Sequence, residues 1–252
     1  MCTWAMRCLL IEDGDRLILV DNGIGNKQDA KFFAHYYLHG DDTLDKSLAK
    51  HGFGRKDITD VILTHLHFDH CGGSIEKTGD SFEPAFINAN YWSNEEHWEW
   101  AVKPNDREKA SFLKENILPI QESGHLQFVS LTNVDWDASL PLPTQQFEEN
   151  ISLRFVEGHT NAMMLPQIQY KGRTIVFMAD LLPSAGHIPI PYVMAYDMFP
   201  LTTLNEKKSF LKEAVENNYI LFFEHDAQTE CCELQQTEKG IRAGQHLRIE
   251  DL

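Results

Sequence analysis

Four side chains that can bind a metal ion lie within six residues of one another: His65, His67, Asp69 and His70. They follow an apolar run, Ile58–Leu63, that is typical of a short buried strand. In an extended chain alternate side chains share a face, so His65 and His67 point the same way and can bind one ion. Asp69 and His70 follow in a turn, so their side chains point in another direction and can bind a second ion. Imidazole and carboxylate groups at this density favour zinc or a similar divalent ion.

Three further candidate ligands each come directly after a predicted strand: His159, Asp180 and His225. Loops at strand ends collect functional groups on a rigid scaffold. With the first cluster they make five histidines and two aspartates, enough for two ions that share one carboxylate. Taken alone, each of the three would be a structural or turn residue. The cluster at 65–70 is different, because four ionisable groups after an apolar strand are costly to desolvate unless something binds them.

The elements that would position these residues come as strands first and helices after, in each half of the chain. A capping box, Ser93 with Glu96, favours a helix start, and residues 131–150 are expected to form a long loop. This order favours two antiparallel-rich sheets with helices on their outer faces. The predicted strands are 8–11, 17–20, 58–63, 151–156, 164–170, 173–178 and 220–223, and the predicted helices are 43–52, 92–102, 107–117 and 204–216.

The composition narrows the class of protein. The chain has 252 residues, with 22 Lys and Arg against 38 Asp and Glu, a formal net charge of −16. Such a charge repels phosphate backbones, so nucleic acid is not an expected partner. No apolar run reaches the length of a membrane span, no signal-peptide layout is visible, and the five cysteines are irregularly spaced. We therefore expect a reduced, cytoplasmic protein without a membrane partner.

The order of the motifs resembles that of the metallo-β-lactamase superfamily: His-x-His-x-Asp-His after a strand, Gly-His-Thr, a strand ending in Asp, and a late strand ending in His. The resemblance implies an α/β (α+β) fold, the four-layer αβ/βα metallo-β-lactamase sandwich, with residues 1–252 as a single domain. It also implies a cofactor of two divalent metal ions, expected to be Zn²⁺. Position by position, it assigns the first ion to His65, His67 and His159, the second to Asp69, His70 and His225, and the bridging role to Asp180.

Within the superfamily, the chain resembles the N-acyl-homoserine lactonase branch, which is itself similar to methyl parathion hydrolase. The residues that carry this likeness are 2–7 (CTWAMR), 64–73 and 180–197. The β-lactamases proper usually have cysteine in place of Asp180, and the flavodiiron proteins have Glu in place of His67, so neither branch is favoured. The lactonase branch normally has an N-terminal strand and loop before the Cys-Thr-Trp segment, so we expect that strand to be either truncated or lost here.

The resemblance implies a hydrolase in which a metal-bridging hydroxide opens lactone rings, first of all those of N-acyl-homoserine lactones in quorum quenching. Asp69 is placed to take the proton and pass it to the leaving oxygen, or it serves only as a ligand. One alternative is a phosphotriester, phosphodiester or other carboxylic ester hydrolase on the same di-zinc site. Another is a non-catalytic scaffold that keeps the fold.

Residues around the ligands have expected supporting roles. Asp21 ends a predicted strand and should accept a hydrogen bond from a ligand imidazole. Candidates for substrate contact are Tyr192, Tyr196 and His187 in one loop, and Phe68 beside the first cluster, with loop or core packing as the alternative for each. The expected partner is a small ester or lactone, and a homodimer is left open.

Overall fold

The protein is described by a computed structural model that covers residues 2–131 and 141–252. Its described residues form two compact units, each built on its own sheet. We call them the N-terminal unit (Cys8–Ser93 and Ala101–Phe128) and the C-terminal unit (Met1–Arg7, Asn94–Trp100 and Val129–Leu252). That residues 1–252 form a single domain stays a prediction.

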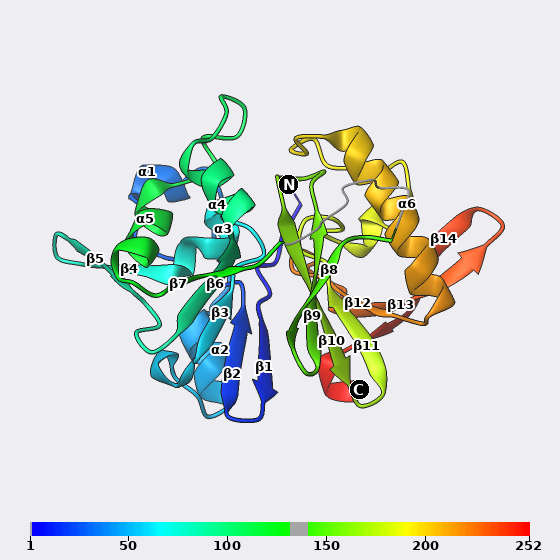
Figure 1. Ribbon diagram of the computed structural model, residues 1–252, viewed down its shortest axis with the longest axis horizontal. Coiled ribbons are helices and arrows are strands. Elements are labelled where there is room, and N and C mark those ends of the chain that lie inside the picture. The colour runs from blue at the N-terminus through cyan, green and yellow to red at the C-terminus, as the bar shows by residue number, and fades with distance from the viewer. Residues whose placement is uncertain (1, 132–140) are drawn as a thin grey trace. The chain divides into compact units, whose positions relative to one another are not determined.

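The N-terminal unit contains a five-stranded sheet in the order β1-β2-β3-β6-β7 (Figure 1). β1 and β2 form the predicted antiparallel hairpin, and β3 runs parallel to both β2 and β6. A separate hairpin is formed by β4 and β5. The strands are β1 Leu9–Asp13, β2 Arg16–Val20, β3 Asp60–Ile62, β4 Ile75–Thr78, β5 Ser81–Pro84, β6 Asn90–Asn94 and β7 Leu126–Val129.

The middle of this sheet forms the core of the unit. Ile18, Val20, Val61 and Ile62 are fully buried, as expected for parallel strands covered on both faces, which are apolar without interruption. Leu63 continues the run and is also fully buried. The apolar run ends at Leu63, so the segment with the first candidate cluster follows directly on a rigid, buried strand.

Five helices lie in the first half of the chain: α1 Ala30–Phe33, α2 Leu44–Lys50, α3 Phe68–Cys71, α4 Glu95–Val102 and α5 Lys114–Glu122. The predicted helix 43–52 is confirmed as α2, with the Thr43 side chain accepting a hydrogen bond from the Lys46 amide at 3.2 Å. The helix predicted at 107–117 is displaced, because residues 106–111 form turns and α5 starts only at Lys114.

The helix predicted from residue 92 begins three residues later. Trp92 belongs to β6, where it pairs with Ile62 of β3. The cap is Asn94 rather than Ser93, because Asn94 Oδ1 accepts the His97 amide at 2.8 Å. Strand pairing therefore overrides the capping box that the sequence suggests.

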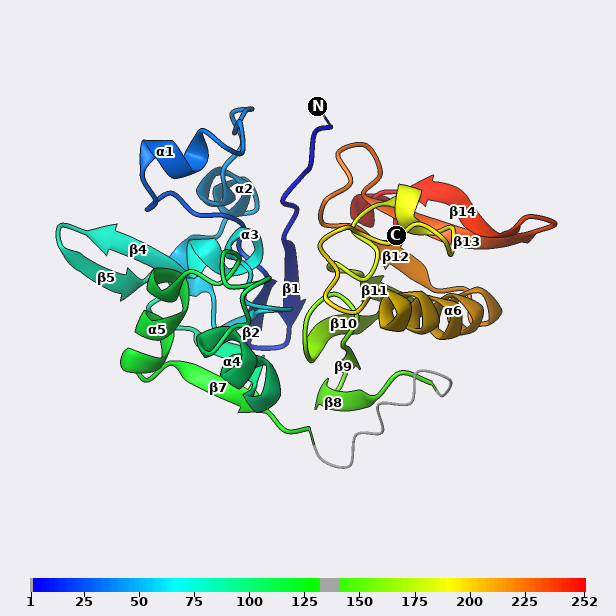
Figure 2. The ribbon, with the colours of Figure 1, turned by 90° about the horizontal axis from the view of Figure 1, so that it is seen from above.

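The C-terminal unit contains a seven-stranded sheet in the order β14-β13-β12-β11-β10-β9-β8. β11 and β12 are parallel and all other neighbours are antiparallel. Helix α6 (Pro200–Glu216) joins the parallel pair and packs against β13 and β14 (Figures 1 and 2). The strands are β8 Thr144–Glu148, β9 Ile151–Val156, β10 Met163–Tyr170, β11 Arg173–Phe177, β12 Ile220–Phe222, β13 Cys231–Thr237 and β14 Gly240–Leu247.

Four strands and one helix predicted in this half are confirmed as β9, β10, β11, β12 and α6. The turn at Lys171-Gly172 has positive φ angles of 49° and 77°, which suit a tight hairpin. The prediction of a loop over residues 131–150 is partly wrong, because residues 144–148 form β8, which pairs with β9. Residues 132–140 of that loop lie outside the described residues.

The mixed α/β class is confirmed by these sheets and helices. The five cysteines are all in the described ranges, and no disulfide joins them. In the part of the chain that the structure covers, none of the helices is long and apolar enough to cross a bilayer.

Candidate functional site

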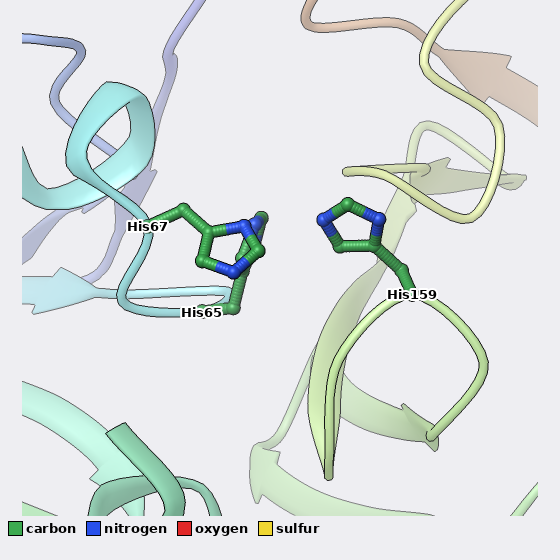
Figure 3. A group of neighbouring side chains, drawn as sticks. All are labelled: His65, His67 and His159. Carbon is green, nitrogen blue, oxygen red and sulfur yellow. The ribbon is translucent and has the colours of Figure 1, made fainter. Parts of the chain in front are cut away.

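The loop that leaves β3 brings three imidazoles together within the N-terminal unit. The ring centroid of His65 is 4.5 Å from that of His67 and 3.9 Å from that of His70. Figure 3 shows the first two rings on this loop. All three residues are buried, whereas the Asp69 side chain is 29% exposed and its Oδ2 lies 3.9 Å from His70 Nε2. The four residues of the sequence cluster are thus neighbours in space.

A one-turn helix, α3, orients the second half of this cluster. The His67 backbone is extended, and its carbonyl accepts the amides of His70 at 3.1 Å and Cys71 at 3.0 Å. The helix ends against the chain that follows β2, where the backbone amide of Asn22 donates to the His70 carbonyl at 2.9 Å. A Cβ on Gly72 would lie 2.2 Å from the carbonyl oxygen of Ile24 in that same stretch, so only glycine permits this approach.

Asp21 fixes the protons on two of these rings. Its Oδ2 lies 3.0 Å from His70 Nδ1 and also accepts the Thr64 hydroxyl at 2.7 Å. Because that hydroxyl gives its proton to Asp21, its oxygen is left to accept from His65 Nδ1, 3.1 Å away. In neutral rings, the lone pair then lies on Nε2 of both His65 and His70.

Glu108 fixes the proton on the His67 ring, at Nε2 rather than at Nδ1. The carboxylate is 4% exposed, and its Oε1 lies 2.9 Å from His67 Nε2. Asn105 donates to the other carboxylate oxygen at 3.3 Å. Since a carboxylate accepts, His67 carries its proton on Nε2 and presents Nδ1 as the lone-pair atom. Glu108 lies 41 residues from His67, and no local sequence signal marks it.

In the C-terminal unit, Asp180 lies between two of the predicted ligands. Its Oδ2 is 3.1 Å from His159 Nε2, and its Oδ1 is 3.1 Å from His225 Nε2. Asp180, His159 and His225 are 5%, 2% and 3% exposed, respectively. Each of the three follows the end of a different strand: β9, β11 or β12. These strands end at the same edge of the sheet, which brings the three side chains together. Figure 3 shows His159 on its loop. The three remote candidates are therefore neighbours too.

Both of these imidazoles donate their other N–H to an acceptor. His159 Nδ1 lies 3.0 Å from Asp197 Oδ1, and His225 Nδ1 lies 2.8 Å from the Ala5 carbonyl. A neutral ring so held presents a lone pair at Nε2, facing a carboxylate oxygen of Asp180 in each case. Two acceptors repel at 3.1 Å unless a second proton or a cation lies between them. The donor set therefore fits a divalent metal ion.

In each unit, one residue beside a predicted ligand has a strained backbone. Asp21 has φ 54° and Ala179, directly before Asp180, has φ 39°. Residues other than glycine rarely adopt the left-handed region. Both positions therefore depend on their surroundings for their conformation.

Helix α6 supports the loop that carries His159. Glu206, which is 3% exposed, accepts the amides of Glu157 at 2.6 Å and Gly158 at 3.1 Å. The Gly158 carbonyl accepts the Phe199 amide at 2.8 Å, at the start of the helix. Burial raises the pKa of Glu206 to about 7.

We expect the shifted pKa of Glu206 to make stability fall with rising pH. The folded chain holds this proton more tightly than the unfolded chain, so the free energy of unfolding decreases between pH 4.5 and about 7 and then levels off. In urea titrations, Glu206→Gln should lose this decline, which is on the order of 3 kcal/mol. Parallel pH profiles for the variant and the wild type would contradict it.

The four candidate substrate contacts are found in different surroundings. Tyr192 and Tyr196 are 61% and 72% exposed. His187 Nδ1 lies 2.8 Å from the Ser184 hydroxyl, and burial lowers the pKa of His187. The ring of Phe68 packs within the N-terminal unit on two other aromatic rings, those of Phe32 and Tyr36. The roles of these four residues with a substrate stay predictions.

Three solved structures show the same fold. A probable metal-dependent hydrolase from Staphylococcus aureus is 23% identical, with a TM-score of 0.83 over 99% of this chain and 83% of that one. AidC, a dizinc quorum-quenching lactonase, is 22% identical, with a TM-score of 0.75 over 98% and 81%. A mutant of AiiA from B. thuringiensis, with N-decanoyl-L-homoserine bound at the active site, is 20% identical, with a TM-score of 0.66 over 89% and 82%.

The family itself is shown by the sequence match. A comparison with curated proteins finds no significant match. Residues 7–225, however, match the family model described as the Metallo-beta-lactamase superfamily, and this range includes every predicted ligand. The chain therefore belongs to the metallo-β-lactamase superfamily, whose members are metal-dependent hydrolases.

Proposed function

We propose that this protein is a hydrolase that opens lactone rings with two divalent metal ions, zinc being the expected metal. In this proposal each ion has three protein ligands of its own and shares one carboxylate. The first ion is assigned to His65, His67 and His159, the second to Asp69, His70 and His225, and the shared carboxylate to Asp180.

The observation that carries the proposal is the environment of Asp180. Each of its two oxygens faces a ring nitrogen whose partner nitrogen already donates elsewhere, to Asp197 or to the Ala5 carbonyl. Each oxygen of the Asp180 carboxylate therefore lies beside the lone pair of one imidazole nitrogen. This is the arrangement expected of a carboxylate that bridges two cations, with one imidazole on each cation. The acceptors behind the imidazoles support the proposal further, because such partners fix ligand rings in metal sites.

Bound divalent ions would supply a Lewis acid for the ester carbonyl and would lower the pKa of a coordinated water towards neutrality. The chain's own part is to orient and to move protons. Among the described residues, Asp69 is the only predicted ligand that is partly exposed rather than buried, with 29% of its side chain exposed, which leaves its carboxylate accessible for proton transfer. Acting first as base and then as acid, Asp69 would return the proton to the leaving alkoxide oxygen.

N-acyl-homoserine lactones are the substrates that we propose first, with quorum quenching as the role. Two proteins that share this fold support the choice, since AidC is a quorum-quenching lactonase and the AiiA mutant has N-decanoyl-L-homoserine bound at its active site. The net charge of −16 argues against large polyanionic substrates. It does not argue against small neutral phosphotriesters, which remain the second candidate.

The test is hydrolysis by zinc-loaded protein of two substrate panels, measured by proton release. One panel contains N-acyl-homoserine lactones of several chain lengths, and the other contains paraoxon-like triesters and simple aryl esters. We expect lactones to have the highest kcat/KM, and metal-free protein to be inactive. If the lactones stay intact while the triesters are cleaved rapidly, the proposed function changes to that of a phosphotriester hydrolase.

A further inference from the structure

We infer that the segment Trp4–Arg7, defined here as the N-terminal clamp, is a positioning element for His225 and thereby controls the affinity for one of the two proposed metal ions. The inference rests on the proposed metal site. All the contacts that carry it lie within the C-terminal unit.

His225 needs such support because it lies beyond the end of its strand. β12 ends at Phe222, three residues earlier. On one side, the His225 amide donates to the Pro183 carbonyl at 3.2 Å. On the other side, the His225 carbonyl accepts the Ala5 amide at 3.1 Å, and the Glu224 carbonyl accepts the Arg7 amide at 3.0 Å. The clamp thus extends the pairing of the sheet past the end of β12.

The clamp also fixes the ring of His225. The Ala5 carbonyl accepts from His225 Nδ1 at 2.8 Å, so Ala5 is bonded to both the backbone and the side chain of the ligand. The Trp4 ring lies against the imidazole, with centroids 4.9 Å apart and planes at 38°. The Ala5 contact sets which nitrogen carries the proton, and the Trp4 contact limits rotation of the ring.

Arg7 ties the two flanks of His225 together. Its Nη1 donates to the Phe223 carbonyl at 2.7 Å and to the Asp226 carbonyl at 3.0 Å. These carbonyls belong to residues on either side of the ligand, so the guanidinium holds the turn that presents it. Because none of these groups is a proposed ligand, the clamp acts through His225.

The experiment measures metal affinity rather than activity. Arg7→Met removes the guanidinium and Trp4→Ala removes the ring. The affinities of both metal sites are measured in metal-free protein in two ways. Zn²⁺ is titrated in competition with a chelator, and Co²⁺ is titrated and followed by visible spectra. Matched controls are Arg248→Met, whose guanidinium pairs only with Glu250 among the contacts described, and Tyr170→Ala, a tyrosine 38% exposed against 42% for Trp4. Arg7→Lys and Trp4→Phe test for rescue.

We expect one ion to bind about 10- to 100-fold more weakly in Arg7→Met and Trp4→Ala, and the other to keep its affinity. The melting temperature of the metal-free variants should match that of their controls, and the conservative variants should recover part of the loss. Unchanged affinities for both ions would overturn the inference, as would an equal loss of both together with a lower melting temperature. A wild type that binds fewer than two ions would instead overturn the proposed function, and the inference with it.

Discussion

Asp180→Asn is expected to lower the proposed lactone hydrolysis by more than about 100-fold. Substitutions of residues that only orient metal ligands cost about 10- to 100-fold, and a shared ligand should cost more. The amide has one acceptor oxygen, whereas the carboxylate presents an acceptor to both His159 Nε2 and His225 Nε2. The asparagine NH₂ can donate to one of these nitrogens, so the substitution favours the metal-free arrangement.

The measurement is kcat together with the number of ions bound per chain. Because asparagine has nearly the same shape as aspartate, the melting temperature of metal-free Asp180→Asn should stay at or above that of the wild type. Asp106→Asn is the control, since that side chain is 99% exposed and pairs only with Lys109 among the contacts described. Wild-type turnover by Asp180→Asn would contradict the two-metal proposal.

Gly158→Ala is expected to destabilise the protein by about 3 kcal/mol or more, beyond the range of most overpacked sites. A Cβ at this position would lie 2.4 Å from the amide nitrogen and 2.5 Å from the Cα of Thr203. These are backbone atoms of α6, so no side-chain rotation relieves the contact. The start of the helix and the His159 loop would have to move apart, against the bonds that Glu206 and Phe199 make to Gly158.

Urea unfolding of the metal-free protein gives the free energy directly, without a contribution from bound ions. Gly54→Ala is the matched control, because its Cβ would meet only Asp57 Oδ2, at 3.7 Å, and its φ is −130°. We expect the control to change stability by less than about 1 kcal/mol. Equal midpoints for the two variants would show that the His159 loop does not need glycine.

The sequence predicts correctly that the residues of the first candidate cluster lie close together, because its signal is local. His65, His67 and His70 lie within one short segment after an apolar strand, and the structure keeps them as neighbours. The acceptors behind the rings are different. Glu108 and Asp197 are 41 and 38 residues from their histidines, so only the tertiary fold brings each pair together. Asp21 is an exception, because its position at the end of a strand suggests its place near a ligand.

The errors in secondary structure have a similar origin. Trp92 and Ser93 fit a helix start by local composition, but pairing of β6 with β3 keeps them in a strand. β8 has a polar sequence, TQQFE, without a clear alternating pattern, and it forms a strand because β9 offers it a partner. In both cases a non-local backbone ladder outweighs a local preference.

The left-handed backbone of Ala179 has a consequence for how the proposed site would bind metal. Its φ of 39° is unfavourable for a residue with a side chain, on the order of 1–2 kcal/mol. That cost is incurred when the chain folds, not when an ion arrives. Because Asp180 is also buried between two imidazoles, its carboxylate would be preorganised, and little conformational entropy would remain to be lost on coordination. A glycine at position 179 would relieve the strain but would restore that entropy, trading affinity for stability.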